Sequence, residues 1–354
     1  MPPEGSSGSL TSSLISLTLE TARDQYKQTG AKKSAPLCTP PLSPLTPEPE
    51  FCHTTAFQTA TFPSHVRAYS SRAKHDSPGE LVRLLDDIST ASHSISSYVS
   101  RHHHDDQGPS LDPLIASKRL HSALCHDGYA CLILDKEYDR PLTFCDSALH
   151  GPYVVMITPL DIDPSEQHLM CGTLFSVYKR TSSPSVSGRL EDLCQKTVDQ
   201  IAAGYIMYAS ATTLQYTLGK GVHSFCLHPV ATQFFLNPSK PLRFAGKNDL
   251  YCDYAVVKSD ATLGTVTTSL VKRLQGRIYD NGCFVADFDG AVRSGGIVLW
   301  YNLHLFCEAA PMAFLAEQMG GRAVDAQCNR ILGKFITICS AQTAAFLLSC
   351  VILS

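Results

Sequence analysis

The clearest pattern in the chain is a run of apolar residues at helical spacing near residue 80. Leu81, Leu84, Leu85, Ile88 and Ile95 recur within "SPGELVRLLDDISTASHSISSYVS". This spacing places the five side chains on one face of an α-helix. The sequence therefore predicts a helix over residues 77–100 that opens with a serine–glutamate capping box. A second helical pattern follows over residues 114–124.

Short apolar runs predict β-strands in the middle of the chain. The single strands are expected in "YACLIL", "YVVMI" and "GTLFSVYKR", and a hairpin in "VHSFCLHP" with "ATQFFLN". The stretch "EDLCQKTVDQIAAGYIMYAS" has the pattern of a helix that runs into a strand. These elements mix strands and helices in the first half of the chain.

The second half alternates strand, helix and strand. The elements are expected in "GIVLWYN", "LFCEAAPMAFLAEQMGG" and "FITICS", and the Gly pair at 320–321 is a helix stop. The apolar end "TAAFLLSCVILS" is too short to span a bilayer and predicts a buried helix or strand. The whole pattern indicates a layered α/β architecture with two subdomains that share one interface.

Residues 1–76 differ from the rest in composition. They are rich in Ser, Thr and Pro, as in "CTPPLSPLTPEPEF". Such a segment buries too little apolar surface to offset its ordering entropy, so we expect it to be disordered. The ordered part then divides into an N-terminal α+β subdomain over 77–180 and a C-terminal α/β subdomain over 181–354.

Charge and cysteine content exclude several classes of protein. The net charge of −3 leaves no basic surface for nucleic acid, and no signal peptide or membrane span is evident. The 14 cysteines contain no C-x-x-C pair, which is typical of reduced thiols in a cytoplasmic protein. The histidine run in "RHHHDDQG" suggests metal binding, but adjacent histidines on a polar loop do not converge on one ion, and a solvated loop is favoured.

Four stretches together resemble the class 1 fructose-1,6-bisphosphatase family. They are "GELVRLLDDISTASHSISSYV", "AAGYIMYASATTL", "VADFDGAVRSGGIVLW" and "CEAAPMAFLAEQMGG", in the family's order and spacing. The resemblance implies a layered αβαβα sugar-phosphatase fold and a homotetramer. It also implies Mg²⁺-dependent hydrolysis of a sugar bisphosphate, in which clustered carboxylates hold the metal ions.

The metal-binding motif is only partly retained. The resemblance assigns Asp112 and Glu137 to catalysis, and Asp161, Glu308 and Glu137 to metal binding. The family has carboxylates where this chain has Lys136 and Thr158. An ammonium about 4 Å from a dication costs about 8 kcal/mol at an effective dielectric of 20. We therefore expect Lys136 to replace a metal ion and to pair with Asp161 and Glu308. If hydrolysis survives, Mg²⁺ is the expected cofactor. If it does not, no cofactor is expected.

The phosphate-binding motifs have changed as well. The family's Gly-Ser-Ser falls on Ile162, Asp163 and Pro164, which offer fewer donors and an added negative charge. Asn248 and Tyr251 match residues that hold the substrate's retained phosphate in the family; the alternative is a turn and a packed aromatic ring. The family's Arg-Tyr pair falls on Tyr279 and Asp280, and His304 lies where an arginine is common.

Three functions agree with this sequence. The first is a phosphatase with impaired or redirected chemistry that binds a small molecule such as a phosphorylated sugar. The second is a non-hydrolytic descendant recruited to specialised metabolism. The third is a pseudoenzyme subunit that assembles with an active homologue. The resemblance implies a homo-oligomer, and no nucleic-acid or membrane partner is expected.

Overall fold

The structure, a computed structural model, describes residues 60–72, 78–103, 111–138, 140–143, 151–162, 170–237, 242–244, 249–259, 261–325, 329–334 and 347–353. All of them belong to one compact unit, Ala60–Ser354. None of the described helices is long and apolar enough to cross a membrane.

Three helices open the described chain: α2 (Phe62–Arg72), α3 (Pro78–His103) and α4 (Pro113–His126). The five apolar residues that predicted α3 are all fully buried. The Asp112 carboxylate caps α4, because it accepts a hydrogen bond from the Leu114 amide at 2.9 Å, and Pro113 occupies the first helical turn. The serine of the predicted capping box, Ser77, lies outside the described residues.

An eight-stranded sheet follows, in the order β2-β1-β3-β4-β5-β6-β7-β8. β1 and β3 are parallel, and every other neighbouring pair is antiparallel. Its central strands are buried on both faces, which explains their uninterrupted apolar sequences. The strands are β1 (Ala130–Asp135), β2 (Leu142–Thr143), β3 (Tyr153–Asp161), β4 (Cys171–Lys179), β5 (Ala202–Tyr208), β6 (Thr213–Thr217), β7 (His223–His228) and β8 (Gln233–Leu236).

A five-stranded sheet has the order β10-β9-β11-β13-β12. β9, β10 and β11 are parallel, and β13 is antiparallel to both of its neighbours. The strands are β9 (Leu250–Cys252), β10 (Ile278–Tyr279), β11 (Ile297–His304), β12 (Arg322–Val324) and β13 (Leu347–Leu353). The remaining helices are α5 (Tyr254–Ser259), α6 (Ala261–Leu274), α7 (Phe284–Ser294), the π-helix η3 (Leu305–Ala309) and α8 (Ala310–Gln318).

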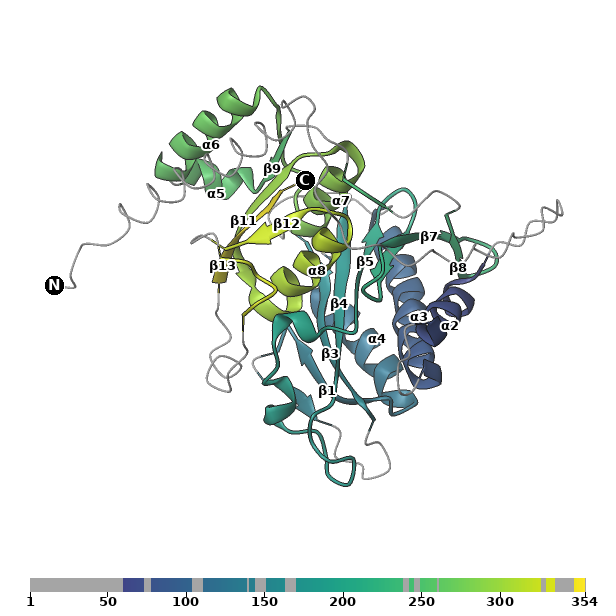
Figure 1. Cartoon of the computed structure of the whole chain (residues 1–354). Helices are drawn as coiled ribbons and strands as arrows, with labels where there is room; N and C mark the ends of the chain where they lie inside the picture. Colours follow the sequence, from purple (N-terminus) through teal and green to yellow (C-terminus); the bar gives the residue numbers. More distant parts are fainter. Residues whose placement is uncertain are drawn as a thin grey trace, which may run out of the picture. The chain divides into compact units, whose positions relative to one another are not determined.

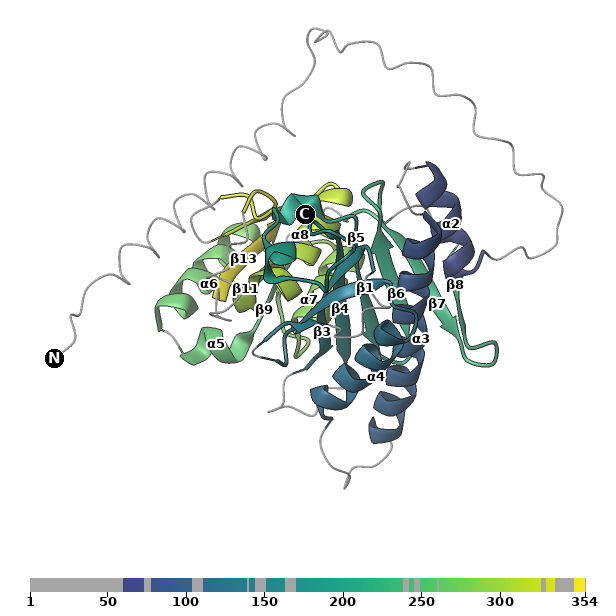
Figure 2. The ribbon, with the colours of Figure 1, turned by 90° about the horizontal axis from the view of Figure 1, so that it is seen from below.

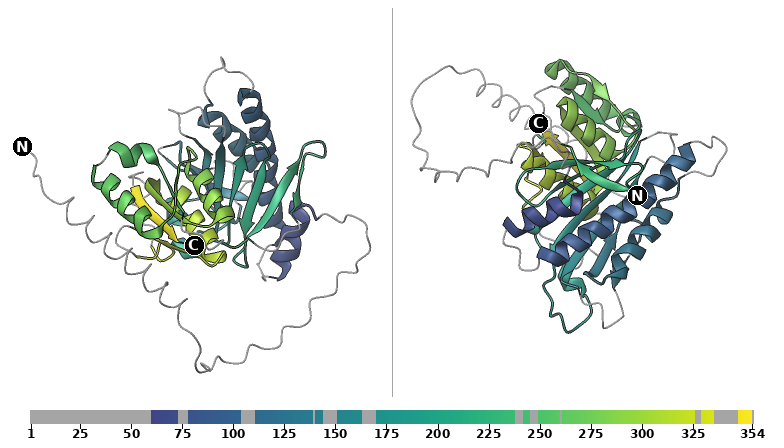
Figure 3. Two further views of the ribbon diagram at one scale, coloured as in Figure 1. Left: turned by 90° about the horizontal axis from the view of Figure 1, so that it is seen from above. Right: turned by 90° about the vertical axis from the view of Figure 1, so that its right-hand side faces the viewer.

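The two sheets and three groups of helices form layers. One hydrophobic core lies between α2–α4 and the first sheet, and a second core joins the other face of that sheet to α7, α8 and the second sheet. Figures 1 and 2 show α5 and α6 outside the second sheet. Figure 3 shows α2–α4, in purple and blue, on the side of the first sheet opposite the green and yellow helices. The predicted mixed α/β fold is confirmed.

Two expected boundaries need correction. The segment 1–76 was expected to be disordered, yet α2 lies within it and buries Phe62 and Val66. The Phe62 ring packs edge-on against Tyr216 at 5.0 Å, so this short helix gains its order from the first sheet. Residues 1–59 lie outside the described residues. The boundary at residue 180 falls between the paired strands β4 and β5, whereas the chain changes sheets between β8 and β9.

Other local predictions have mixed outcomes. The β7–β8 hairpin is present, and α8 ends before the Gly pair, with Gly320 at φ +88°. The helix expected before β5 consists instead of two short 3₁₀ turns, η1 (Leu190–Leu193) and η2 (Thr197–Asp199). The apolar chain end forms strand β13. The strand expected in "FITICS" lies outside the described residues.

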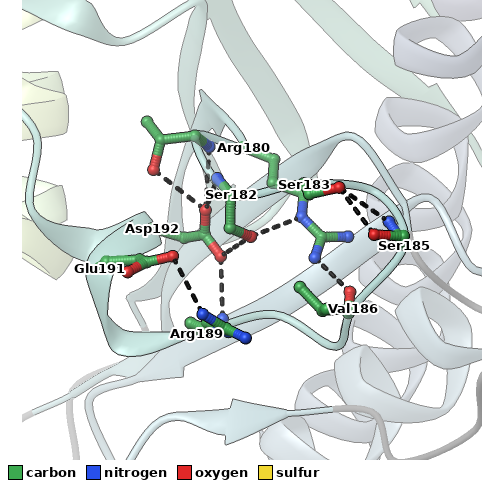
Figure 4. A network of polar contacts seen from close by, with 9 residues as sticks. Arg180, Ser182, Ser183, Ser185, Val186, Arg189, Glu191 and Asp192 are labelled. Atoms are coloured by element: carbon green, nitrogen blue, oxygen red, sulfur yellow. Dashed lines mark hydrogen bonds and ion pairs between the residues drawn. The ribbon is translucent and has the colours of Figure 1, made fainter.

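A buried aspartate organises the connection between β4 and β5. The Asp192 carboxylate accepts hydrogen bonds from the amides of Ser182 and Arg189 at 2.6 and 2.8 Å, and from the hydroxyls of Thr181 and Ser182. Arg180 extends the network through Ser182, with Nε to Oγ at 2.9 Å (Figure 4). Burial raises the pKa of Asp192, but these hydrogen bonds outweigh it and lower the pKa below 3.8.

We expect Asp192→Asn to destabilise the protein by about 2–3 kcal/mol at pH 7, because an amide replaces one acceptor oxygen with a donor that faces N–H groups. The folded-state pKa of Asp192 is depressed, so its stabilisation is present above the ordinary value of 3.8 and is lost as pH falls through the folded value. Urea unfolding at several pH values measures both effects. The exposed Asp199→Asn, in the same connection, is the control. Equal losses in the two variants would contradict this role.

Candidate functional site

The centre of the site is an ion pair between two residues that are 172 positions apart. Lys136 follows β1, and its Nζ lies 2.5 Å from Oε1 of Glu308, which belongs to η3. The Glu308 side chain is 2% exposed and that of Lys136 is 36% exposed. The other Glu308 oxygen accepts the His304 amide hydrogen at 2.6 Å. The predicted pairing of Lys136 with Glu308 is therefore present, and Lys136 and the His304 amide together occupy both oxygens of the carboxylate.

Asp161, at the end of β3, acts on Lys136 through its charge. Burial lowers the pKa of Lys136, but the charges of Glu308 and Asp161 outweigh burial and raise it. The Asp161 carboxylate accepts the Val285 amide hydrogen at 2.8 Å, within the first turn of α7. Burial raises the pKa of Asp161 to about 6, while Lys136 and the Val285 amide act in the opposite direction. Two positive partners thus stabilise this carboxylate: an ammonium and a helix N-terminus.

Thr158 lies inside the protein and faces the π-helix. Its side chain is fully buried, and its hydroxyl donates a hydrogen bond to the Cys307 carbonyl at 3.1 Å. This bond ties β3 to η3 directly beside Glu308. The position that carries a carboxylate in the family pattern has a structural hydrogen bond here.

His304 opens the π-helix and is uncharged. Its Nδ1 accepts the Cys307 amide hydrogen at 3.3 Å, and burial lowers the pKa of the imidazole. The His304 side chain thus serves as the cap of the π-helix.

Glu137 and Asp112 lie within electrostatic reach of the ion pair. Burial raises the pKa of Glu137, Lys136 lowers it, and Asp135, Glu308 and Asp112 raise it further. Asp112 serves as the cap of α4, as described above. The structure thus brings together Lys136, Glu137, Glu308 and Asp112, whose catalytic and metal-binding roles stay predictions. Asp106, in the "RHHHDDQG" run, lies outside the described residues.

Sequence reasoning missed a close contact between His121 and the buried Asp135, next to Lys136 in the chain. His121 Nε2 on α4 lies 2.7 Å from Oδ2 of Asp135, the last residue of β1. The other Asp135 oxygen accepts the Glu137 amide hydrogen at 2.8 Å. These two contacts hold the turn that carries Lys136 and Glu137. No sequence pattern links a histidine on one helix to an aspartate at a strand end.

The two expected substrate residues have separate outcomes. Asn248 lies outside the described residues. Tyr251 lies on β9, is 3% exposed, and stacks on Tyr279 with ring centroids 5.1 Å apart. Burial raises the pKa of Tyr251, and a hydrogen bond with Ser294 lowers it. This packing favours the interpretation of Tyr251 as a core aromatic, while its predicted role in phosphate binding stays a prediction.

A cavity of about 260 Å³ opens beside the ion pair. Carboxylates and aromatic rings from both sheets line it. The described lining residues are Lys136, Asp161, Ile162, Asp253, Asp280, Gly282, Cys283, Phe284, Trp300, Tyr301, Leu303 and Glu308. Sequence reasoning did not assign Asp253 or Trp300 to a site, and it noted Asp280 only as the residue at a position of the family's Arg-Tyr pair. The strand pattern held a usable signal, because Asp253 and Asp280 directly follow the parallel strands β9 and β10.

These residues do not fit the family's magnesium ions. Glu308 is bonded to Lys136 and His304, Asp161 to the N-terminus of α7, and the Thr158 hydroxyl faces a carbonyl. Across the residues that the structure describes, no three His, Cys, Asp or Glu side chains are placed to share one metal ion. Mg²⁺ needs several oxygen ligands and excludes a neighbouring ammonium.

The similar proteins reported below share one name, fructose-1,6-bisphosphatase. The family described as "Fructose-1-6-bisphosphatase, N-terminal domain" matches residues 67–239. The class 1 fructose-1,6-bisphosphatase of Chloroherpeton thalassium is 32% identical over 283 residues, covering 72% of this chain and 80% of the relative. The class 1 enzyme of Chlorobaculum parvum is 31% identical over 244 residues, covering 62% of this chain and 70% of the relative.

Solved structures agree in fold. The holo form of Leishmania major fructose-1,6-bisphosphatase superimposes with a TM-score of 0.68 at 23% identity, covering 84% of this chain and 95% of the other. The T-state form gives a TM-score of 0.71 at 24% identity, with the same coverage. With identity above 30% over most of two curated relatives, this chain belongs to the class 1 fructose-1,6-bisphosphatase family.

Proposed function

We propose that this protein is a diverged fructose-1,6-bisphosphatase in which metal-dependent hydrolysis of sugar bisphosphates is impaired or redirected. The observation that supports this is the Lys136–Glu308 ion pair at 2.5 Å. The family's mechanism requires carboxylates free to hold magnesium. Here an ammonium is bonded to the carboxylate that the family pattern assigns to the metal.

Charge explains why a metal ion would not simply displace the lysine. A divalent cation about 4 Å from Lys136 costs about 8 kcal/mol at an effective dielectric of 20. The raised pKa of Lys136 keeps it protonated at neutral pH, so the repulsion persists. Thr158 supplies a neutral hydroxyl, already bonded to Cys307, in place of a second carboxylate. The residues of this site stabilise one another without an ion.

A non-hydrolytic ligand-binding protein is the second candidate. The cavity of about 260 Å³ favours it, because a pocket with polar and aromatic walls persists although the metal chemistry is disfavoured. A hydrolytic site needs an activated water, whereas a binding site needs only shape and complementary groups.

The first test is metal binding. Calorimetric titration of the protein with Mg²⁺ and Mn²⁺ is expected to show no saturable site at micromolar concentrations, because Lys136 repels both ions. The double substitution Lys136→Glu with Thr158→Asp is expected to create such a site. Arg189→Glu, which at an exposed residue makes the same charge reversal as Lys136→Glu, is the control and should bind no metal. Micromolar binding by the unmodified protein that is abolished by Asp161→Ala would refute the proposal.

The second test is phosphate release. With Mg²⁺ present, the unmodified protein and its Asp161→Ala variant are expected to release phosphate from fructose 1,6-bisphosphate at indistinguishable, near-background rates. A panel of other sugar bisphosphates checks for a redirected substrate. Metal-dependent release that falls by two or more orders of magnitude in Asp161→Ala would show that hydrolysis survives.

The third test is the stability of the ion pair. Lys136→Met is expected to cost about 2 kcal/mol, below the ~3–5 kcal/mol of a fully buried pair, because the Lys136 side chain is 36% exposed. The double variant Lys136→Met with Glu308→Gln should lose less than half as much unfolding free energy as Lys136→Met alone. The glutamine side chain is uncharged, and its oxygen can still accept the His304 amide hydrogen. Urea unfolding of the two single variants and the double variant measures these free energies. The exposed Lys220→Met is the control, and its unfolding free energy is expected to lie within about 0.5 kcal/mol of that of the unmodified protein. Additive effects of the two substitutions would show that the residues do not interact.

A further inference from the structure

We propose that the cavity beside Lys136 binds a small organic cation, an ammonium compound of monosaccharide size or less, and not a phosphorylated anion. This inference rests on the proposed function, because bound magnesium would reverse the charge of the cavity. It goes beyond that proposal by assigning the chemical class of the ligand.

The described walls of the cavity carry an excess of negative charge. Four carboxylates line it, those of Asp161, Asp253, Asp280 and Glu308, against the single ammonium of Lys136. Glu308 and Lys136 neutralise each other through their ion pair. The remaining carboxylates therefore attract a cation and repel the phosphates of a sugar bisphosphate.

Asp253 and Asp280 are held in place by backbone hydrogen bonds. The Asp253 carboxylate accepts the Val256 amide hydrogen at 3.0 Å, in the first turn of α5. The two Asp280 oxygens accept the amide hydrogens of Gly282 and Tyr254 at 3.0 and 2.8 Å. A carboxylate has about four acceptor positions, so each can still accept a hydrogen bond from a ligand. Both are thus preorganised acceptors at the ends of β9 and β10.

An aromatic wall complements these carboxylates. Trp300 and Phe284 line the cavity, and their ring centroids lie 5.7 Å apart. The indole Nε1 of Trp300 donates to Asp287 Oδ2 at 2.9 Å, and Asp287 accepts further hydrogen bonds from Asn281 at 2.8 and 2.9 Å. This network fixes the orientation of the indole. Aromatic rings beside carboxylates are typical of sites for organic ammonium ions, which interact favourably with the π face.

The size and the neutral groups of the cavity narrow the ligand further. A volume of about 260 Å³ is below the roughly 300–1,000 Å³ of pockets for drug-sized ligands, which indicates a small molecule. The thiol of Cys283 also lines the cavity, and burial holds its pKa well above the ordinary value, so it stays neutral and does not react as a thiolate. The walls therefore suit a polar cation with some apolar surface.

The single tryptophan provides a probe for this cavity, because Trp300 is the only tryptophan in the chain. Its fluorescence is titrated in EDTA with three matched pairs: glucosamine and glucose, ethanolamine and ethylene glycol, and benzylamine and benzyl alcohol. At least one amine is expected to change the emission saturably and to bind on the order of tenfold more tightly than its neutral counterpart. Fructose 1,6-bisphosphate without metal is expected to bind more weakly than that amine.

Variants test whether the carboxylates recognise the ligand. Asp280→Asn and Asp253→Asn are each expected to weaken amine binding on the order of fivefold or more and to leave binding of the neutral counterpart unchanged. Glu191→Gln, an exposed carboxylate outside the cavity lining, is the control and should bind like the unmodified protein. The thermal unfolding midpoint of each variant shows whether it is folded, and the two aspartate variants serve as independent tests.

Failure of this inference and failure of the proposed function give different results. If no metal binds and no amine binds more tightly than its neutral partner, the inference is wrong and the proposed function stands. If Mg²⁺ alone changes Trp300 emission at micromolar concentration, the proposed function is wrong, and the inference falls with it. Tight binding of fructose 1,6-bisphosphate in EDTA, in preference to every amine, would also overturn the inference.

Discussion

Lys136 and Glu308 meet at the junction of the two sheets, and the surrounding structure depends on their neutralising each other. The π-helix that carries Glu308 contacts β3 and β4 of the first sheet and β11 and β13 of the second. A carboxylate that is 2% exposed here would be costly to bury without a partner. The Lys136 ammonium supplies that partner at 2.5 Å.

Thr158 and Asp161, which lie near this ion pair, are each held by a hydrogen bond within the protein. Thr158, fully buried, bonds to the carbonyl of Cys307, one residue before Glu308, so that β3 and the π-helix are joined by a neutral contact. Asp161 is oriented toward the N-terminus of α7, where the Val285 amide and the helix dipole stabilise its charge. π-helical turns occur often at functional sites, and this one holds Glu308 at the end of a long strand. Glu308 and Asp161 thus each have a partner within the protein.

The cavity lies beside the Lys136–Glu308 ion pair. Its position between the sheets follows from the fold, because the ends of β9 and β10 place Asp253 and Asp280 opposite the ends of β1 and β3. Its charge follows from this chain's own residues. Its described lining has four carboxylates and one ammonium.

The sequence by itself determined the local elements and the identity of the decisive residues. Uninterrupted apolar runs predicted β1, β3 and β4, the helical spacing of Leu81 to Ile95 predicted α3, and motif register identified Lys136 and Thr158. Only the tertiary structure decided that α2 is ordered against Tyr216, that His121 fixes Asp135, and that Asp253, Asp280 and Trp300 share one cavity. Periodicity reports which side of an element is buried, because burial repeats with the local geometry of the backbone. Contacts between residues as distant as Lys136 and Glu308 depend on strand order and on the path of the chain between the sheets, and a local pattern does not encode these.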